Sequence, residues 1–351
     1  KSGQHPDYLP KARLEISVMV SRMLTHLQET RQFTSPYAPE FVLIGARVSG
    51  PLVEHLGHPL YVMGKGETEQ IAQTRMCGEA AERASILAHR TNDSWVAQNG
   101  LTGAQTTIIP NQFFGAPFSV GTHGCASHNQ FDTACKLAVN ELWERRAVQD
   151  WWEQKSELRV LDKSHALFDE MQAFVSGARA GAIDQRTTQF GLIKGPYAAD
   201  VAVAISHDQT MDQFALAFAA GAGVQGGLFR RAFEELLSVE LETADLFRAH
   251  LDGDDIGKDT NRYVVRARQQ ALAQRLPSEL ETANPIAAHS AALQACTPLN
   301  DRLQSSLDLG CPVWLIDQTH DAIGVPTIRA VFENPDLHPF ATYDKKAVTP
   351  L

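Results

Sequence analysis

The chain has 351 residues, of which 44% are hydrophobic and 21% charged, a composition typical of a globular protein with one large or two ordinary domains. The formal net charge of −10 argues against nucleic-acid binding, because that function needs a basic face. The longest apolar run, 214–224, is too short and too rich in glycine and alanine to cross a membrane. The five cysteines are odd in number and widely spaced, which favours a reducing compartment, and we expect the protein in the cytoplasm.

The first third of the chain mixes helical and strand patterns. Residues 11–30 carry apolar side chains at helical spacing, which predicts a helix. Gly64-Lys65-Gly66 predicts either a flexible surface loop or a turn whose lysine meets a phosphate, and it leads into a helix expected over 68–89. Short apolar runs bounded by glycine and proline predict strands at 41–46, 60–63, 106–110 and 117–120.

The rest of the chain repeats one order of elements. A small polar loop, 121–129, precedes a long helix expected over 131–154, and a Gly-rich turn, 221–227, precedes another that reaches His250. The order strand, small polar loop and long Glu-bearing helix therefore occurs three times. Further helices are expected at 164–177, 261–275 and 292–307, and strands at 200–206, 213–220, 313–317 and 325–332.

Residues 79–83 and 141–145 both read Glu-x-x-Glu-Arg in the middle of a predicted helix. Positions three apart share a helix face, so Glu79 and Glu82 point into one space, and Glu141 and Glu144 into another. If the two helices face each other, four carboxylates converge, which is costly unless a cation lies among them.

Each copy alone is typical of a solvated helix face with an i,i+4 ion pair. Two copies, each after a Gly-containing loop, instead favour two Mg²⁺ ions held together with the phosphates of ATP. Arg83 and Arg145 would then orient the glutamates or reach phosphate. Arg230 and Glu234 on the third helix are again either a surface pair or, beside a phosphate loop, a γ-phosphate contact.

Two motifs suggest other cofactors. His123, Cys125 and His128 have a spacing that suggests zinc, but no fourth ligand lies nearby, and an anion-binding loop at a helix N-terminus is the better interpretation. Residues 221–226 read G-x-G-x-x-G, which indicates a nicotinamide-dependent oxidoreductase if a second strand ends in an acidic residue about 20 positions later. The acidic residues in that range, 240–245, lie inside the predicted helix, so this reading stays an alternative.

The ordered set of motifs resembles the YcaO family over about residues 64–340. The set consists of Lys65 before the first Glu-x-x-Glu-Arg, Asn129 before the second, the Arg230/Glu234 helix, and the closing segment 317–326. The region 121–152 is most similar to the cyclodehydratase component of microcin-type heterocycle synthetases.

The resemblance implies an α+β fold with a mixed or antiparallel sheet, in which long Glu-bearing helices form a nucleotide site. It implies an N-terminal helix and strand region at 1–63, a catalytic domain at 64–340 and a tail at 341–351. The implied activity needs ATP and Mg²⁺: a Cys, Ser or Thr side chain of a ribosomally made precursor peptide attacks the preceding carbonyl, the oxygen is phosphorylated, and phosphate leaves to give a thiazoline or oxazoline.

The resemblance also implies roles for individual residues. The metal ligands would be Glu79, Glu82, Glu141 and Glu144, and the catalytic residues Glu82, Glu144 and Arg230. ATP would be bound by Lys65, Arg83, Ser127, Asn129, Arg145, Arg230 and Glu234.

The implied partners are the precursor peptide, a leader-binding subunit resembling ubiquitin-activating enzymes, and a flavin dehydrogenase, the last two on separate chains around a homodimeric core. Two positions depart from the family pattern: Ala126 stands where serine is frequent, with Ser127 beside it, and Thr133 where an acidic residue is usual. Thioamide or macroamidine formation is an alternative activity, and a non-catalytic scaffold or docking subunit is an alternative from another class.

Overall fold

The computed structural model describes residues 19–50, 53–54, 59–89, 93–114, 122–183, 186–193, 201–208, 213–221, 225–251, 260–286 and 299–337. Within these ranges the strands form three sheets, each covered by helices, and the fold is α+β as the sequence predicts. Every strand pair is antiparallel except β7–β11, which is parallel.

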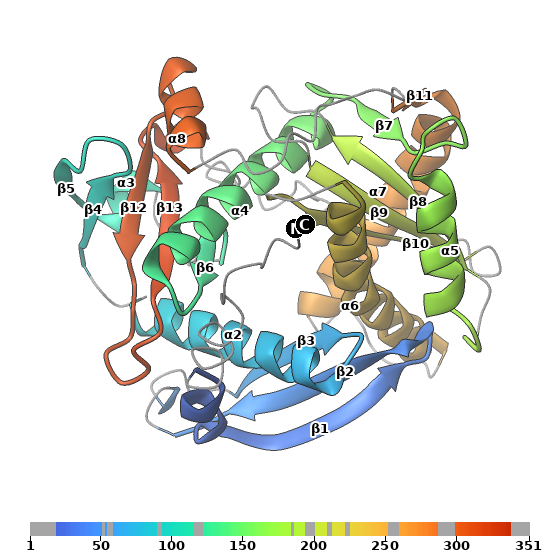
Figure 1. Cartoon of the computed structure of the whole chain (residues 1–351), viewed down its shortest axis with the longest axis horizontal. Coiled ribbons are helices and arrows are strands. Elements are labelled where there is room, and N and C mark those ends of the chain that lie inside the picture. Colours follow the sequence, from blue (N-terminus) through green and yellow to red (C-terminus); the bar gives the residue numbers. More distant parts are fainter. Residues whose placement is uncertain are drawn as a thin grey trace, which may run out of the picture.

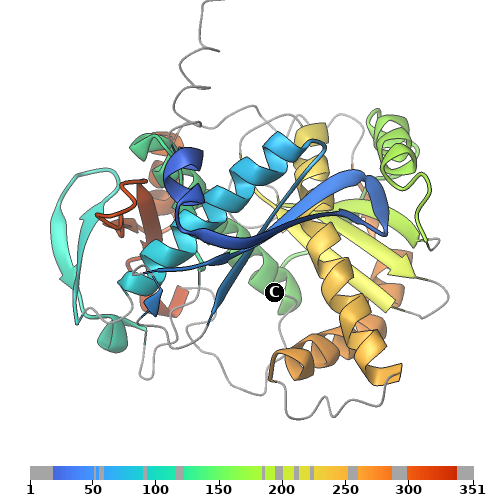
Figure 2. The ribbon, with the colours of Figure 1, turned by 90° about the horizontal axis from the view of Figure 1, so that it is seen from below.

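The first sheet has the order β1–β2–β3 and is covered by helix α2. Figure 2 shows its three strands, in blue, crossing against this helix. Small side chains of α2, such as Ala72 and Ala80, are fully buried in the core that helix and sheet share. The elements are β1 (Leu27–Ser35), β2 (Ala38–Val48), β3 (Leu60–Gly66) and α2 (Glu69–Ala88).

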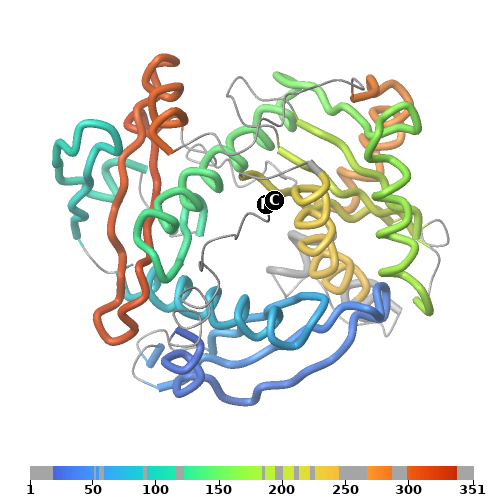
Figure 3. The backbone as a smooth tube through the Cα atoms, in the orientation of Figure 1, coloured from blue at the N-terminus to red at the C-terminus, as the bar shows by residue number. Residues whose placement is uncertain are grey.

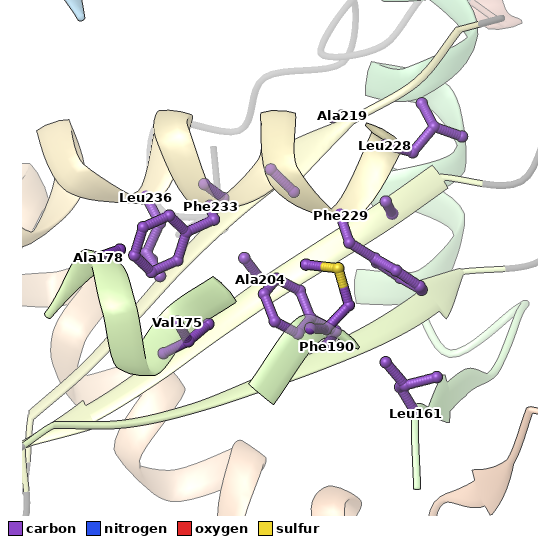
Figure 4. Close-up of a cluster of buried hydrophobic side chains, with 14 of the residues drawn as sticks. Leu161, Val175, Ala178, Phe190, Ala204, Ala219, Leu228, Phe229, Phe233 and Leu236 are labelled. Carbon is purple, nitrogen blue, oxygen red and sulfur yellow. The ribbon is translucent and has the colours of Figure 1, made fainter. Parts of the chain in front are cut away.

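The second sheet has the order β10–β9–β8–β7–β11 and lies between helices. On one face, Phe229 and Phe233 of α6 pack with Phe190 of β8 and with α5 (Figure 4). On the other face, Leu272 and Leu276 of α7 pack against β9 and β10. The elements are β7 (Leu158–Val160), α5 (Phe168–Ala178), β8 (Arg186–Ile193), β9 (Val201–Asp208), β10 (Gln213–Ala219), α6 (Gln225–Leu251), α7 (Thr260–Thr282) and β11 (Asn284–Pro285).

The third sheet has the order β5–β4–β12–β13–β6 and joins distant parts of the chain. Leu142 and Trp143 of α4 pack on one face beside α8, and Phe114, after α3, packs on the other. The elements are β4 (Trp95–Asn99), β5 (Gln105–Ile108), α3 (Pro110–Phe113), β6 (Cys125–Ser127), α4 (Phe131–Trp152), α8 (Leu299–Asp308), β12 (Val313–Asp317), β13 (Thr327–Phe332) and a short 3₁₀ turn, Pro335–Leu337.

The helices α2, α4 and α6 lie on three sides of the centre of the molecule, each with its own sheet behind it (Figures 1 and 3). Each helix follows a strand of that sheet, namely β3, β6 and β10. This arrangement confirms the predicted succession of a strand and a long helix, although the second strand, β6, lies within the segment predicted as a polar loop, 121–129. It also places the two Glu-x-x-Glu-Arg motifs on helices that border the same central region.

Two local predictions are wrong. The predicted helix over 11–30 does not continue to residue 30: residues 19–24 are helical, and β1 begins at Leu27, because pairing with β2 overrides the local helical pattern. Gly64-Lys65-Gly66 is not a loop but the end of β3. A Cβ atom on Gly64 would lie 1.9 Å from the carbonyl oxygen of Ala72, so the glycine lets the strand pack directly on α2.

The helices predicted at 68–89 and 131–154 are confirmed almost to the residue, and Thr68 caps the first of them by accepting a hydrogen bond from the N–H of Ile71. The strands β1, β4, β6, β7 and β8 were not predicted individually. The strand predicted at 117–120 and the tail lie outside the described residues, and the domain boundaries stay predictions. None of the helices in the described residues is long and apolar enough to span a membrane.

Candidate functional site

Four glutamates from two helices form a series of interacting charges at the centre of the molecule. On α2, the charges of Glu79 and Glu82 interact, and Glu82 also interacts with Glu141 of α4. Glu141 in turn interacts with Glu144 one turn further along α4. The two Glu-x-x-Glu-Arg motifs therefore face each other.

Three of these carboxylates accept a hydrogen bond from a backbone N–H in a strand or directly after one. The N–H of Met63 in β3 donates to Glu79 Oε2 at 3.3 Å, and the N–H of Ser127 in β6 donates to Glu82. The N–H of Ala220, directly after β10, donates to Glu144 Oε2 at 2.8 Å. All three sheets thus hold the carboxylate group in place.

Burial makes these carboxyl groups poor acids. It raises the pKa of Glu79 and of Glu144, and it raises the pKa of Glu141 to about 7, against the opposing charge of Arg145. Burial, together with the charges of Glu141 and Glu79, raises the pKa of Glu82 well above its ordinary range. Ionisation of the whole group is therefore favourable only with further positive charge nearby.

Two arginines of the motifs pair with the glutamates. Arg83 lies 2.7 Å from Glu79, and Arg145 lies 3.5 Å from both Glu141 and Glu144. The Nε of Arg145 is buried and has no hydrogen-bond partner among the described residues, and the same holds for Nη2 of Arg231 on α6. Buried donors without acceptors are costly, so both point to an oxygen-rich ligand at this site.

Helix α6 contributes a second charged layer. Lys65, only 8% exposed at the end of β3, donates to Glu235 Oε2 at 2.7 Å and to Ser238 Oγ at 2.7 Å. Arg75 of α2 donates to Glu234 Oε2 at 2.6 Å and to the carbonyl oxygen of Lys65 at 2.8 Å. These contacts fix α6 against β3 and α2.

The structure does not bring Arg230 into this group. Its guanidinium lies 3.3 Å from Glu170 and stacks on the ring of Phe174, both on α5. The neighbouring Arg231 interacts instead with Glu144 and Glu234. Successive residues differ by about 100° around a helix, so a prediction that is off by one residue names a side chain on the outer flank of α6 instead of the one that faces the glutamates.

The loop before α4 contributes mainly its backbone. Besides donating its N–H to Glu82, Ser127 hydrogen-bonds through Oγ to Thr327 Oγ1 at 2.6 Å. Asn129 is half-buried just before the N-terminus of α4, with no contact to the glutamates among those the structure shows. Ala126 belongs to the apolar core, and Thr133 Oγ1 donates to Gln130 at 3.2 Å near the start of α4.

The described residues support neither the zinc site nor the nicotinamide site that the sequence motifs suggest. Cys125 Sγ contacts the carbonyl oxygen of His123, and His128 Nδ1 accepts the N–H of Gln130. The G-x-G-x-x-G turn at 221–226 leads into α6, which among the described elements is followed by α7 and then by β11, a partner of β7 rather than of β10. Within the residues that the structure describes, no βαβ unit follows the motif, so the dinucleotide fingerprint lacks its context there.

A magnesium–nucleotide complex fits the residues present. In the part of the chain that the structure describes, no three His, Cys, Asp or Glu side chains lie close enough to hold a metal ion by themselves. Mg²⁺ usually takes one or two carboxylates and completes its shell with phosphate oxygens and water. The glutamates, together with the unpartnered donors of Arg145 and Arg231, match that division of ligands.

Several residues of the site were not predicted from the sequence: Arg75, Arg231, Glu235, Ser238 and Arg329. Arg329 of β13 is 1% exposed, donates to the carbonyl oxygen of His123 at 3.3 Å, and lowers the pKa of Glu141 against the larger effect of burial. The α6 residues had a signal. Positions 231 and 238 lie opposite the stripe formed by Leu228, Phe229, Ala232, Phe233, Leu236 and Leu237, and position 235 lies on its flank.

Comparison with known proteins assigns the chain to a protein family. A family model described as YcaO cyclodehydratase, ATP- and Mg²⁺-binding, matches residues 89–337. No protein with a curated function matches the sequence significantly.

Solved structures share the fold. One is YcaO from Methanopyrus kandleri bound with AMPPCP and Mg²⁺, with a TM-score of 0.69, 14% identity, and coverage of 97% of this chain and 94% of that chain. Another is a heterocyclase in complex with substrate and cofactor, with a TM-score of 0.65, 15% identity, and coverage of 90% of this chain and 52% of that one. The E. coli microcin synthetase McbBCD complex matches with a TM-score of 0.57, 10% identity, and coverage of 89% and 88%.

Proposed function

The chain belongs to the YcaO family, with ATP and Mg²⁺ as its cofactors, and on this premise we propose that it is a cyclodehydratase that forms thiazoline or oxazoline rings in a ribosomally made precursor peptide. One observation carries the proposal: a series of four interacting carboxylates lies beside two arginines whose buried donors have no acceptor among the described residues. That combination suits a metal-bound, multiply charged phosphate.

ATP would supply the phosphoryl group that makes the amide oxygen of the peptide a leaving group. In each ring closure, a bond forms from the Cys, Ser or Thr side chain to the preceding carbonyl carbon. The former amide oxygen departs with phosphate, and the side chain and the amide nitrogen each lose a proton. The protein forms no covalent bond with the substrates in this reaction, so it contributes by positioning them and by neutralising charge.

The residues divide that work between three helices. Glu79, Glu82, Glu141 and Glu144 would hold Mg²⁺, and Glu82 and Glu144, each oriented by a backbone N–H group, would be the catalytic pair. Lys65, Arg145 and Arg231 would neutralise phosphate charge, and Arg231 takes the role expected of Arg230. Arg83 orients Glu79, while Glu234 and Ser127 position Arg75 and Glu82. Asn129 remains a proposed nucleotide contact at the start of α4.

The proposed partners are the precursor peptide and, on separate chains, a leader-binding subunit resembling ubiquitin-activating enzymes and a flavin dehydrogenase. The E. coli McbBCD complex is a multi-subunit synthetase of this fold, and a related structure contains pro-MccB17. A homodimeric core in the cytoplasm is part of the same proposal.

The test is peptide-stimulated release of ADP and phosphate by the purified protein with its partner subunits. Glu82→Gln and Glu144→Gln should each abolish it, while Glu69→Gln, an exposed change in the first turn of α2, should leave it unchanged. Mass spectrometry of the co-expressed peptide should show the loss of one water per ring. Full turnover in both site variants would refute the assignment, and a product with sulfur in place of oxygen or with an amidine would indicate the sister reactions.

A non-catalytic scaffold is the second candidate, and one observation favours it. Lys65 and Arg75, two cations beside the proposed phosphate site, already pair with Glu235 and Glu234. A scaffold would keep these pairs and bind no nucleotide. Calorimetric titration with ATP and Mg²⁺ separates the two, because absence of binding at high ATP concentration leaves only the scaffold.

A further inference from the structure

Asn140 occupies a buried position directly before Glu141 on α4. It is 7% exposed, and its Oδ1 accepts a hydrogen bond from Nη1 of Arg302 on α8. Arginine can only donate, so the atom that faces it must be the amide oxygen. The orientation of the amide is therefore fixed, and its Nδ2 points away from α8.

That nitrogen meets the guanidinium of Arg231 at Gly221. A Cβ atom added to Gly221 would lie 3.1 Å from Nδ2 of Asn140 and 3.0 Å from Nη2 of Arg231. The donors of Asn140 on α4 and Arg231 on α6 thus meet beside a glycine, the one residue type whose lack of a Cβ leaves room for both. Gly221 follows Ala220, whose N–H binds Glu144, so this point borders the carboxylate group.

One of the two donors is buried and lacks an acceptor: no residue that the structure describes accepts a hydrogen bond from Nη2 of Arg231. Nδ2 of Asn140 lies beside it, while the hydrogen bond shown for this side chain is made by Oδ1. Glu144, whose charge interacts with Arg231, is already engaged by Ala220 and Arg145. A buried N–H group is stable only when an oxygen completes it, and a second donor at the same place can bind the same oxygen.

We propose that Asn140 and Arg231 form a two-donor site for an oxygen of the reacting groups, either a phosphoryl oxygen of ATP or the amide oxygen of the peptide. This inference rests on the proposed function. Arg231 supplies charge, and Asn140 supplies a neutral, directional hydrogen bond that helps fix the direction in which that oxygen lies. Arg302 is a positioning residue, because it sets the orientation of the Asn140 amide.

Asn140→Asp is the sharpest variant, because the carboxylate still accepts from Arg302 while the Nδ2 donor becomes an acceptor. Asn140→Ser removes the donor without adding charge. We expect both to lower kcat/KM for peptide-dependent ATP turnover by roughly 100-fold, the usual effect of losing one such donor. Asn300→Asp, an exposed change on α8, is the matched control and should behave as wild type.

Binding measurements identify the source of the oxygen without relying on turnover. If the donors hold a phosphoryl oxygen, calorimetry should show a Kd for AMPPCP with Mg²⁺ at least tenfold higher in both variants. If they hold the peptide oxygen, that Kd stays unchanged and the Kd for a fluorescent precursor peptide rises instead. Thermal unfolding shows which of the two variants is folded, and the Kd values of the folded variant then identify the source of the oxygen.

Wild-type affinity for both ligands in Asn140→Asp or Asn140→Ser, together with wild-type turnover, would overturn the two-donor site. That result is distinct from failure of the proposed function, in which wild-type protein itself does not release ADP with any precursor peptide. In that case the AMPPCP titration still tests the donor pair.

Discussion

The backbone N–H of Ala220 donates to Glu144 at 2.8 Å, and so the end of β10 holds a side chain of α4 in a different layer of the protein. Met63 and Glu79 repeat the relationship between β3 and α2. A carboxylate held by an N–H keeps one lone pair occupied and the remaining ones directed, which orients it for a cation. The site geometry therefore depends on the packing of complete sheets.

Stability and magnesium binding should respond to pH in opposite ways because of Glu141. Its pKa is raised from 4.5 to about 7, chiefly by burial, so between these values the folded protein holds a proton that the unfolded chain has lost. The stabilisation is fully present below 4.5 and is lost as pH rises through 7. Without Mg²⁺, the unfolding temperature should fall between about pH 5 and pH 8. The stabilisation by Mg²⁺ and ATP should grow over the same range, because Mg²⁺ needs the carboxylate.

Differential scanning calorimetry at a series of pH values checks this, with and without Mg²⁺ and ATP. Glu141→Gln should flatten both pH dependences, since the amide does not titrate. Glu69→Gln, exposed on α2, serves as the control. Unchanged slopes in Glu141→Gln would show that another group titrates.

The register of α6 can be tested by comparing adjacent arginines. Arg231→Met should weaken binding of ATP with Mg²⁺ by roughly 10- to 100-fold, the worth of one charge-assisted hydrogen bond. Arg230→Met should change it by less than about threefold, because that side chain faces α5 and an exposed pair contributes little. The measurement is calorimetric Kd, and a larger effect at Arg230 would contradict the placement of α6.

Gly64→Ala should destabilise the fold rather than impair chemistry directly. The added Cβ would lie 1.9 Å from the carbonyl oxygen of Ala72 and 2.4 Å from the nitrogen of Met76, so β3 and α2 would have to separate. Overpacking of this kind costs about 3 kcal/mol or more. Urea unfolding measures it, and Gly78→Ala, with open space around its Cβ position on α2, should be neutral or slightly stabilising.

Lys65 should matter more to nucleotide binding than to folding. Lys65→Met removes a cation from the phosphate side of the site and should raise the Kd for ATP with Mg²⁺ roughly tenfold. Ser238→Ala removes one of the contacts that hold the ammonium group and should have a smaller effect in the same direction. If Lys65→Met binds ATP with the wild-type Kd, the lysine has only a structural role, namely to connect β3 with α6.

Helical periodicity was a reliable guide to the long helices, because α2 and α4 bury one continuous face and begin after clear polar loops. The doubled Glu-x-x-Glu-Arg motif located one half of the site for the same reason. Short strands such as β6 and β7, with three residues each, carry too little pattern to be recognised. They form because distant partners, β13 and β8, supply their hydrogen bonds.

The other half of the site depended on facts that spacing does not contain. Arg230 and Arg231 are adjacent, as are Glu234 and Glu235, so the i,i+4 rule fits both pairs equally. The apolar stripe of α6 separates the two arginines, because Arg231 lies opposite it and Arg230 lies on its flank over Phe174, but it does not select Glu235 over Glu234. Arg329 could not be found at all from sequence, since its role follows from the pairing of β13 with β6.

The three backbone N–H groups that hold the carboxylates, at Met63, Ser127 and Ala220, are far apart in the sequence. If the chain were divided between α5 and β8, the first piece would keep the Met63–Glu79 and Ser127–Glu82 contacts, and the contact of Ala220 with Glu144 would form only between the two pieces. Nucleotide affinity would then return only when the two pieces reassociate. The protein is thus suited to fragment complementation, with ATP binding as the signal that all three layers have come together.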